Sequence, residues 1–142
     1  MSEQNYKNHI QLVPIWHYIT SLLLLAFLIG SIVNLWYADA HTHYSAALLT
    51  VAGLLLIIFY WYIRAFALKA QDRAIRAEEN FRHFILTGKP FDKQIRISQI
   101  IALRFASDEE MPALAIKAVD EKLTQKQIKQ AIQKWRADHN RV

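Results

Sequence analysis

The chain has no cysteine, and it has only three glycines and three prolines among its 142 residues. Without cysteine there is no disulfide framework and no thiolate metal site. The sequence also contains no glycine-rich phosphate-binding loop, no nucleophile motif and no metalloprotease motif. We therefore expect a protein that is not an enzyme and that needs no cofactor.

Charge is missing from two long stretches near the start of the chain. Residues 13–38 and 45–63 contain no Asp, Glu, Lys or Arg. Each stretch can supply the roughly 20 apolar residues that a helix needs to cross a bilayer. The absence of acidic and basic side chains within them argues against a proton relay or a voltage sensor.

The basic residues gather after the second stretch. Residues 64–142 carry 16 of the 17 Lys and Arg but 10 of the 12 Asp and Glu, which leaves this part of the chain with a net charge of +6. The segment between the stretches, residues 39–44, has no Lys or Arg. Because Lys and Arg stay on the cytoplasmic side of a membrane, both termini are expected in the cytoplasm.

These features predict an all-α membrane protein that is built as a helical hairpin with a cytoplasmic tail. Nothing breaks the second helix before Gly88, so one helix is expected from about Ser45 to Leu86, with Gly88 as its left-handed cap. The predicted parts are a short cytoplasmic N-terminus (1–12), a transmembrane helical hairpin (13–63), a cytoplasmic extension of the second helix (64–90) and a C-terminal helical domain (91–142).

Three short helices are expected in the C-terminal domain. The first covers about 93–105 behind Asp92. Ser107 and Glu110 match a capping box before the second, but Pro112 follows, so either a short 3₁₀ turn spans 107–110 or the helix begins near Met111. Thr124 and Gln127 form a capping box for the third, which covers about 125–138. Their apolar stripes should form a small core, packed against the second long helix at Phe81, Phe84 and Ile85.

Small and polar residues predict how the two membrane helices meet. Gly30 and Gly53 lie at the same depth, and small residues let membrane helices approach closely. Asn34 is expected to face Thr50, because an amide inside a bilayer needs a hydrogen-bond partner. A hydrogen bond between the helices is the favoured interpretation, and the alternative is that Asn34 lines a pore.

Apolar residues on the extension of the second helix recur at alternating spacings of three and four. This is the heptad pattern of a coiled coil. Two interpretations stay open: a parallel homo-oligomer, or packing against the C-terminal helices of the same chain. The seam consists of Ala67, Ala70, Ala74, Ala77, Phe81 and Phe84.

The turn between the stretches contains Asp39, His41 and His43, which could bind Zn²⁺ or Cu²⁺. Histidines two positions apart converge on one ion only in an extended loop, so a polar turn is the favoured interpretation and no metal is expected.

A basic stripe on the last predicted helix contains Lys126, Lys129 and Arg136. On a membrane protein such a stripe favours contact with the anionic headgroups of the lipid bilayer. Nucleic acid is not an expected partner, because no second helix follows to complete a helix-turn-helix.

Three runs of the sequence are similar to those of a known family. They are EQNYKNH at residues 3–9, ALRFASDEEMPAL at 102–114 and LTQKQIKQAIQKWRADHNRV at 123–142. The family is a domain of unknown function, number 6526, found in small bacterial inner-membrane proteins. The resemblance implies the two-span architecture with a cytoplasmic tail in a bacterial inner membrane, and it implies no activity.

Two functions follow as hypotheses. The first is a non-catalytic scaffold or accessory subunit that self-associates, or docks on a larger membrane complex, through the long second helix. The alternative is an oligomeric channel or small-solute pore that is gated by the cytoplasmic tail.

Overall fold

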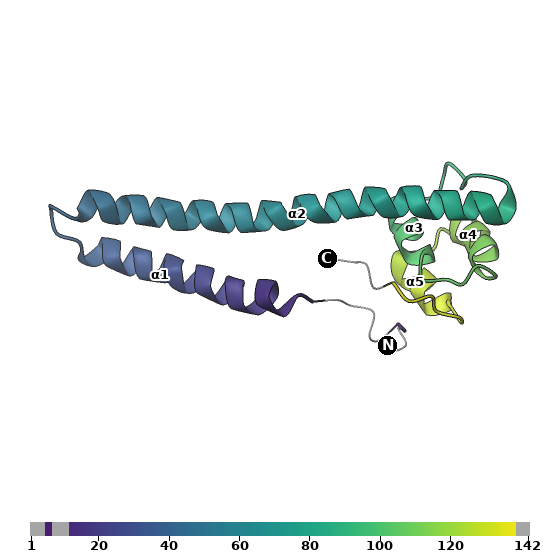
Figure 1. Ribbon diagram of the computed structural model, residues 1–142, viewed down its shortest axis with the longest axis horizontal. Helices are drawn as coiled ribbons and strands as arrows, with labels where there is room; N and C mark the ends of the chain where they lie inside the picture. Colours follow the sequence, from purple (N-terminus) through teal and green to yellow (C-terminus); the bar gives the residue numbers. More distant parts are fainter. Residues whose placement is uncertain (1–4, 7–11, 139–142) are drawn as a thin grey trace. The chain divides into compact units, whose positions relative to one another are not determined.

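The computed structural model describes residues 5–6 and 12–138, so most of the predicted N-terminal segment, residues 1–12, lies outside the described residues. Within the described residues every regular element is a helix, and an isolated bridge joins Ala106 and Trp135. The all-α prediction is therefore confirmed for this part of the chain. The elements are a π-helix at Ile15–Thr20, α1 at Ser21–Tyr37, α2 at His43–Thr87, α3 at Ile97–Leu103, α4 at Met111–Asp120 and α5 at Gln125–Ala131 (Figure 1).

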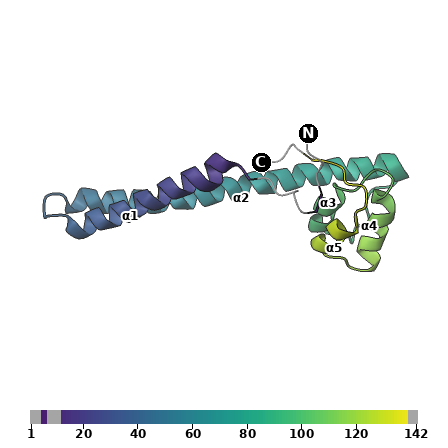
Figure 2. The same ribbon diagram turned by 90° about the horizontal axis from the view of Figure 1, so that it is seen from below.

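The chain divides into two compact units, Leu12–Ala67 and a second unit whose main part begins at Leu68. In the first unit, α1 and the N-terminal part of α2 run side by side in opposite directions and are connected by residues 38–42 (Figures 1 and 2). The second unit contains the rest of α2 together with α3, α4 and α5.

The two apolar stretches form helices that are long and apolar enough to cross a membrane. They are Ile15–Tyr37, with 23 residues, and His43–Thr87, with 45 residues. In an apolar stretch of 18 residues within each helix, only 6% of the first helix's stretch and 11% of the second's is buried. A helix that is apolar all round in a soluble protein would instead be buried in its core.

The start of the first membrane-length helix is a π-helix, which the sequence did not predict. The hydroxyl of Thr20 donates to the carbonyl of Ile15 at 3.1 Å, and the hydroxyl of Ser21 donates to the carbonyl of Trp16 at 3.3 Å. Each bond reaches back five residues along the chain. This spacing matches the wider turn of a π-helix, in which backbone hydrogen bonds also span five residues.

Helix α2 ends where the sequence predicts. Gly88 has a φ of +71°, and its N–H donates to the carbonyl of Phe84 at 2.8 Å. Glycine adopts this left-handed conformation without a steric penalty, so the predicted cap is confirmed. The chain then folds back, and the backbone N–H of Phe91 donates to the side-chain oxygen of Asn80 at 3.0 Å.

The C-terminal helices share a small apolar core. Its largest fully buried side chains are Phe105, Leu103, Met111 and Ile128. The predicted packing of this core against the apolar seam of α2 is wrong, because Phe81 and Ile85 are each 65% exposed and Phe84 is 49% exposed.

Two of these helices begin where the sequence predicts, and the third begins later. Helix α4 begins at Met111, and Thr124 caps α5 by accepting from the N–H of Gln127, as predicted. Helix α3 begins only at Ile97, four residues later than predicted. The Asp92 carboxylate accepts from the N–H of Gln94 and holds a turn there instead.

Helix α5 ends at Ala131, so the prediction of a helix to residue 138 is wrong. The Glu110 carboxylate accepts hydrogen bonds from the backbone N–H groups of Gln133 and Lys134. Trp135 then packs on Phe105, with 5.1 Å between the ring centroids. These contacts replace the last helical turns and hold the segment in an extended form.

Candidate functional site

The predicted seam forms an exposed face on α2. We define the exposed face of α2 as Ala70, Ala74, Ala77, Phe81, Phe84 and Ile85, all of which are exposed. Ala67, one turn earlier, is also exposed. The interpretation that the seam packs against the C-terminal helices of its own chain is therefore wrong. A row of large exposed apolar side chains on a helix is typical of an interaction surface.

The opposite side of α2 is covered by the part of the chain that follows this helix. Ile75, Glu79 and His83 are each less than a tenth exposed. The ring of His83 stacks on Phe91, with 4.3 Å between the centroids, and its Nδ1 lies 2.9 Å from the carbonyl of Lys89. The chain that follows α2 thus covers one side of this helix and leaves most of its apolar face exposed.

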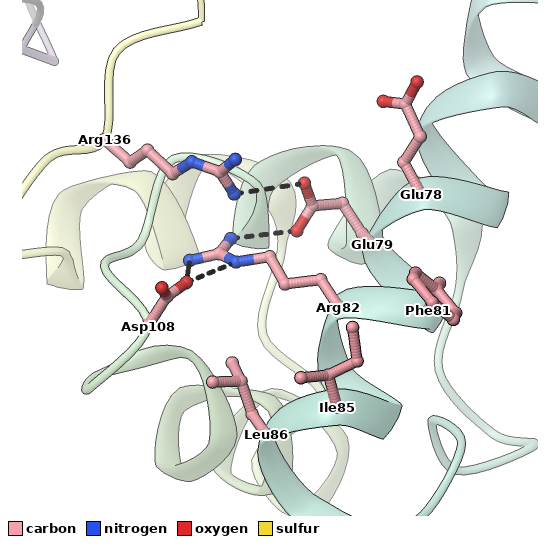
Figure 3. Close-up of a pocket in the computed structure, with 8 residues that line it drawn as sticks. All are labelled: Glu78, Glu79, Phe81, Arg82, Ile85, Leu86, Asp108 and Arg136. Atoms are coloured by element: carbon pink, nitrogen blue, oxygen red, sulfur yellow. Dashed lines mark hydrogen bonds and ion pairs between the residues drawn. The ribbon is translucent and has the colours of Figure 1, made fainter.

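Arg82 is the centre of the polar contact on this packed side (Figure 3). Its guanidinium donates to the Glu79 carboxylate at 2.9 Å, to the Asp108 carboxylate at 2.6 Å and to the carbonyl of Ala106 at 2.7 Å. The Arg82 and Glu79 side chains are only 12% and 10% exposed. The group joins α2 to the loop before α4, so its first role is structural.

A cleft of about 400 Å³ opens beside this group. Arg136 also borders it and lies 3.9 Å from Glu79 (Figure 3). Glu78, Phe81 and Ile85 also line the cleft, and the Arg82 guanidinium on its wall already has three partners.

Each residue of the acidic run before α4 binds a different part of the second unit. Asp108 binds Arg82, Glu109 binds the Lys134 ammonium at 2.6 Å, and Glu110 binds the backbone of the segment after α5. The hydrogen bond that the Lys134 ammonium donates to the Glu109 carboxylate raises the pKa of Lys134 above its ordinary value. Periodicity could not reveal these roles, because every partner lies more than 20 residues away in the sequence.

The contact between α1 and α2 differs in detail from the prediction. Gly53 packs on α1, and a Cβ added there would lie 3.1 Å from Leu28 Cδ1. A Cβ added at Gly30 would have no atom within 4 Å, so the described structure does not bring the two glycines together.

The predicted bond between Asn34 and Thr50 is also replaced. The Thr50 hydroxyl lies 3.1 Å from the carbonyls of Ser31 and Ala46, to which it donates. Asn34 is exposed, and its side chain makes no hydrogen bond to any described residue. Asn34 lies three residues from the end of α1 at Tyr37, or about 4.5 Å along the axis, within reach of a membrane interface.

Aromatic residues hold the other end of this helix pair. The rings of Trp16 and Tyr60 stack with 4.5 Å between their centroids. The Tyr60 hydroxyl donates to the carbonyl of Trp16 at 2.9 Å and lies 2.7 Å from the hydroxyl of Ser21. Such rings, apolar with a polar tip, suit the headgroup level of a bilayer.

The turn between α1 and α2 is closed by Asp39. Its carboxylate accepts from the N–H groups of His41 and Thr42 and from the Thr42 hydroxyl. These bonds, chiefly the one from the Thr42 hydroxyl, lower the pKa of Asp39 below its ordinary value. Residues 5–6 and 12–138 contain no group of three potential ligands placed to hold a metal ion.

The predicted basic stripe does not form on one helix. Lys126 and Lys129 lie on α5, but Arg136 lies beyond its end, in the extended segment. The Lys129 ammonium lies 5.3 Å from the centroid of the Phe105 ring, and the Arg136 guanidinium points toward Glu79.

Together the observations define, for the residues that the structure describes, an all-helical protein with two helices long and apolar enough to cross a membrane. The chain belongs to the family of unknown function DUF6526, whose model matches residues 1–142. The family resemblance seen in the sequence is thus confirmed. No curated protein and no solved structure matches the chain.

Proposed function

We propose that the protein is a non-catalytic component of the bacterial inner membrane, with α1 and α2 as a membrane-spanning hairpin and both termini in the cytoplasm. The length and apolar character of the two helices support the span. The excess of Lys and Arg after residue 63 supports the orientation.

Its role in this proposal is that of a scaffold or accessory subunit, which binds a partner through the exposed face of α2. One observation carries the proposal: the chain that follows α2 contacts Glu79, Arg82 and His83 on one side of that helix, whereas Phe81, Phe84 and Ile85 remain exposed. Burying these side chains against a partner would remove a large apolar surface from water.

The pore alternative has less support. It requires Asn34 and Thr50 to face a water-filled lumen. The Thr50 hydroxyl is instead used within the helix pair, where it donates to backbone carbonyls. Asn34 lies close enough to the end of α1 to be solvated at the membrane surface.

The orientation can be tested by thiol labelling, which is simple because the chain has no native cysteine. Ala40→Cys should react with a membrane-impermeant thiol reagent that is added to cells whose outer membrane has been removed and whose inner membrane is intact. Gln133→Cys should react only after the inner membrane is opened. The reverse pattern would overturn the proposed orientation.

The docking role can be tested by adding bulk to the exposed face of α2. Ala74→Trp should prevent a partner helix from approaching and should shift the native mass of the complex in mild detergent to that of the single chain. Arg76→Trp is the matched control, because Arg76 is exposed on α2 outside that face. An unchanged native mass for Ala74→Trp would refute the docking role.

A further inference from the structure

We propose that the partner on the exposed face of α2 is a second copy of this chain, aligned parallel and in register, and held by ion pairs between Arg73 of each copy and Glu78 of the other. This inference rests on the proposed function and names the partner of the same surface. The experiments below separate failure of the inference from failure of that function.

The first support comes from the charges beside the exposed face. If Ala74 and Ala77 take the central apolar positions of a heptad, Arg73 takes a g position and Glu78 the e position of the next heptad. In a parallel coiled coil, residues at these two positions approach each other across the interface. Opposite charges there stabilise the parallel, in-register pair.

Both charged residues are available for such a contact. Arg73 and Glu78 are exposed, and neither makes an ion pair with another described residue. By contrast, Glu79 and Arg82 of the same helix are bound to each other. The charges that border the apolar face are thus unpaired, whereas those on the packed side are paired.

Insertion in the membrane sets the relative direction of α2 in two copies of the chain. Copies inserted in the same direction send α2 out of the membrane in the same direction, so two copies pair parallel about a two-fold axis along the membrane normal. An antiparallel pair would place g positions against g positions and e positions against e positions, and would not join Arg73 to Glu78.

The sizes of the side chains also suit this pair. Ala74 and Ala77 lie at the level of the two charged residues, and their small side chains allow two helices to approach closely. Phe81 and Phe84 follow, and they are large enough to fill the space at the next level of the pair. The C-terminal part of the chain leaves most of this face open: Phe81 and Ile85 are each 65% exposed, although they line one cleft with Asp108 and Arg136.

Charge exchange tests the ion pairs directly. Dimerisation is measured by energy transfer between labelled full-length copies in lipid vesicles at a series of protein-to-lipid ratios. A two-fold dimer contains two copies of the pair, so Arg73→Glu or Glu78→Arg should each weaken dimerisation by roughly ten- to thirtyfold. Arg76→Glu makes the same charge change outside the face and should have little effect.

The double variant Arg73→Glu/Glu78→Arg recreates the pair with reversed charges, so its dimerisation should return to within about threefold of the original. Mixing the two single variants should also favour mixed dimers over either self-dimer. If the double variant stays as weak as the singles, or if Arg73→Glu behaves like Arg76→Glu, the ion pair is refuted.

Cysteine cross-linking tests the register and the partner. In native membranes, Ala70→Cys and Ala77→Cys should each form a disulfide with its own copy, whereas Arg76→Cys should not. A disulfide only between Ala70→Cys of one copy and Ala77→Cys of another would show an antiparallel pair and overturn the inference. Absence of any dimer would also overturn it, but the docking role would survive if Ala74→Trp still released a different partner.

Discussion

Replacing Arg82 with methionine should loosen the C-terminal helices from α2. Methionine keeps much of the volume of the side chain but removes all of its donors. The Arg82 guanidinium has three acceptors: the Glu79 carboxylate, the Asp108 carboxylate and the carbonyl of Ala106. The substitution leaves Glu79, whose side chain is only 10% exposed, with Arg136 at 3.9 Å as its remaining ion-pair partner.

The magnitude follows from the burial of these partners. Removing one member of a buried ion pair costs about 3–5 kcal/mol, because the other charge is left without compensation. Loss of the contact with Asp108 adds little to this cost, because the Asp108 side chain is 66% exposed and exposed ion pairs contribute about 0–1 kcal/mol to stability. We therefore expect Arg82→Met to lower the free energy of opening of the second unit by about 3–5 kcal/mol.

Hydrogen exchange of the full chain in detergent measures this opening locally. Amides in α3, α4 and α5 should exchange about a hundredfold to several thousandfold faster in Arg82→Met. Arg76→Met, an exposed position on the same helix, should change these rates little. Adding Glu79→Leu to Arg82→Met should recover part of the loss, because an apolar pair leaves no buried charge. Exchange within threefold of the original in Arg82→Met would refute the reasoning.

Two further predictions concern the first unit. Gly53→Leu should lower the thermal midpoint of unfolding in detergent, because the larger side chain would overpack against Leu28 at a cost of about 1–3 kcal/mol. Gly30→Leu should leave the midpoint unchanged, because the space around Gly30 is open. Equal effects of the two substitutions would contradict this packing. The bonds to the Asp39 carboxylate should persist at neutral pH and be lost only as the pH falls through a pKa below 3.8, since the folded value is lowered. The Thr42 amide shift should report that midpoint, and Thr42→Val should move it upward; a midpoint at or above 3.8 in the unsubstituted protein would contradict the contact.

Helix ends that are set by residues close together in the sequence could be predicted from the sequence. The end of α2 at Gly88 and the start of α5 at Thr124 each follow from a conformational or capping preference of one residue. The end of α5 could not be predicted this way. Ile128, Ile132 and Trp135 have helical spacing, but a carboxylate from a distant loop, Glu110, binds the backbone after Ala131 and ends the helix.

The partner of Thr50 shows a second limit. Counting residues from the connecting turn placed it opposite Asn34, but it bonds to the carbonyl of Ser31, about one helical turn away. Depth counts assume that both helices begin at the same level and pack without offset. The hydroxyl also donates to a carbonyl of its own helix, at Ala46, which a pairwise count of polar residues does not consider.

Burial near the end of α2 does not follow the polarity of every residue, and this bears on how the chain assembles. Charged residues such as Glu79 and Arg82 normally indicate a solvated face, yet here they are buried because each neutralises the other. Apolar residues such as Phe81 and Ile85 normally indicate a buried face, yet here they are exposed. A single chain that paired its apolar face internally would have no reason to bury an ion pair on the other side of the helix, at a desolvation cost to both charges. Burial of the exposed apolar face against a partner would offset this cost. The proposed parallel second copy would provide such a partner, because it would present the same apolar residues and would place Glu78 opposite Arg73.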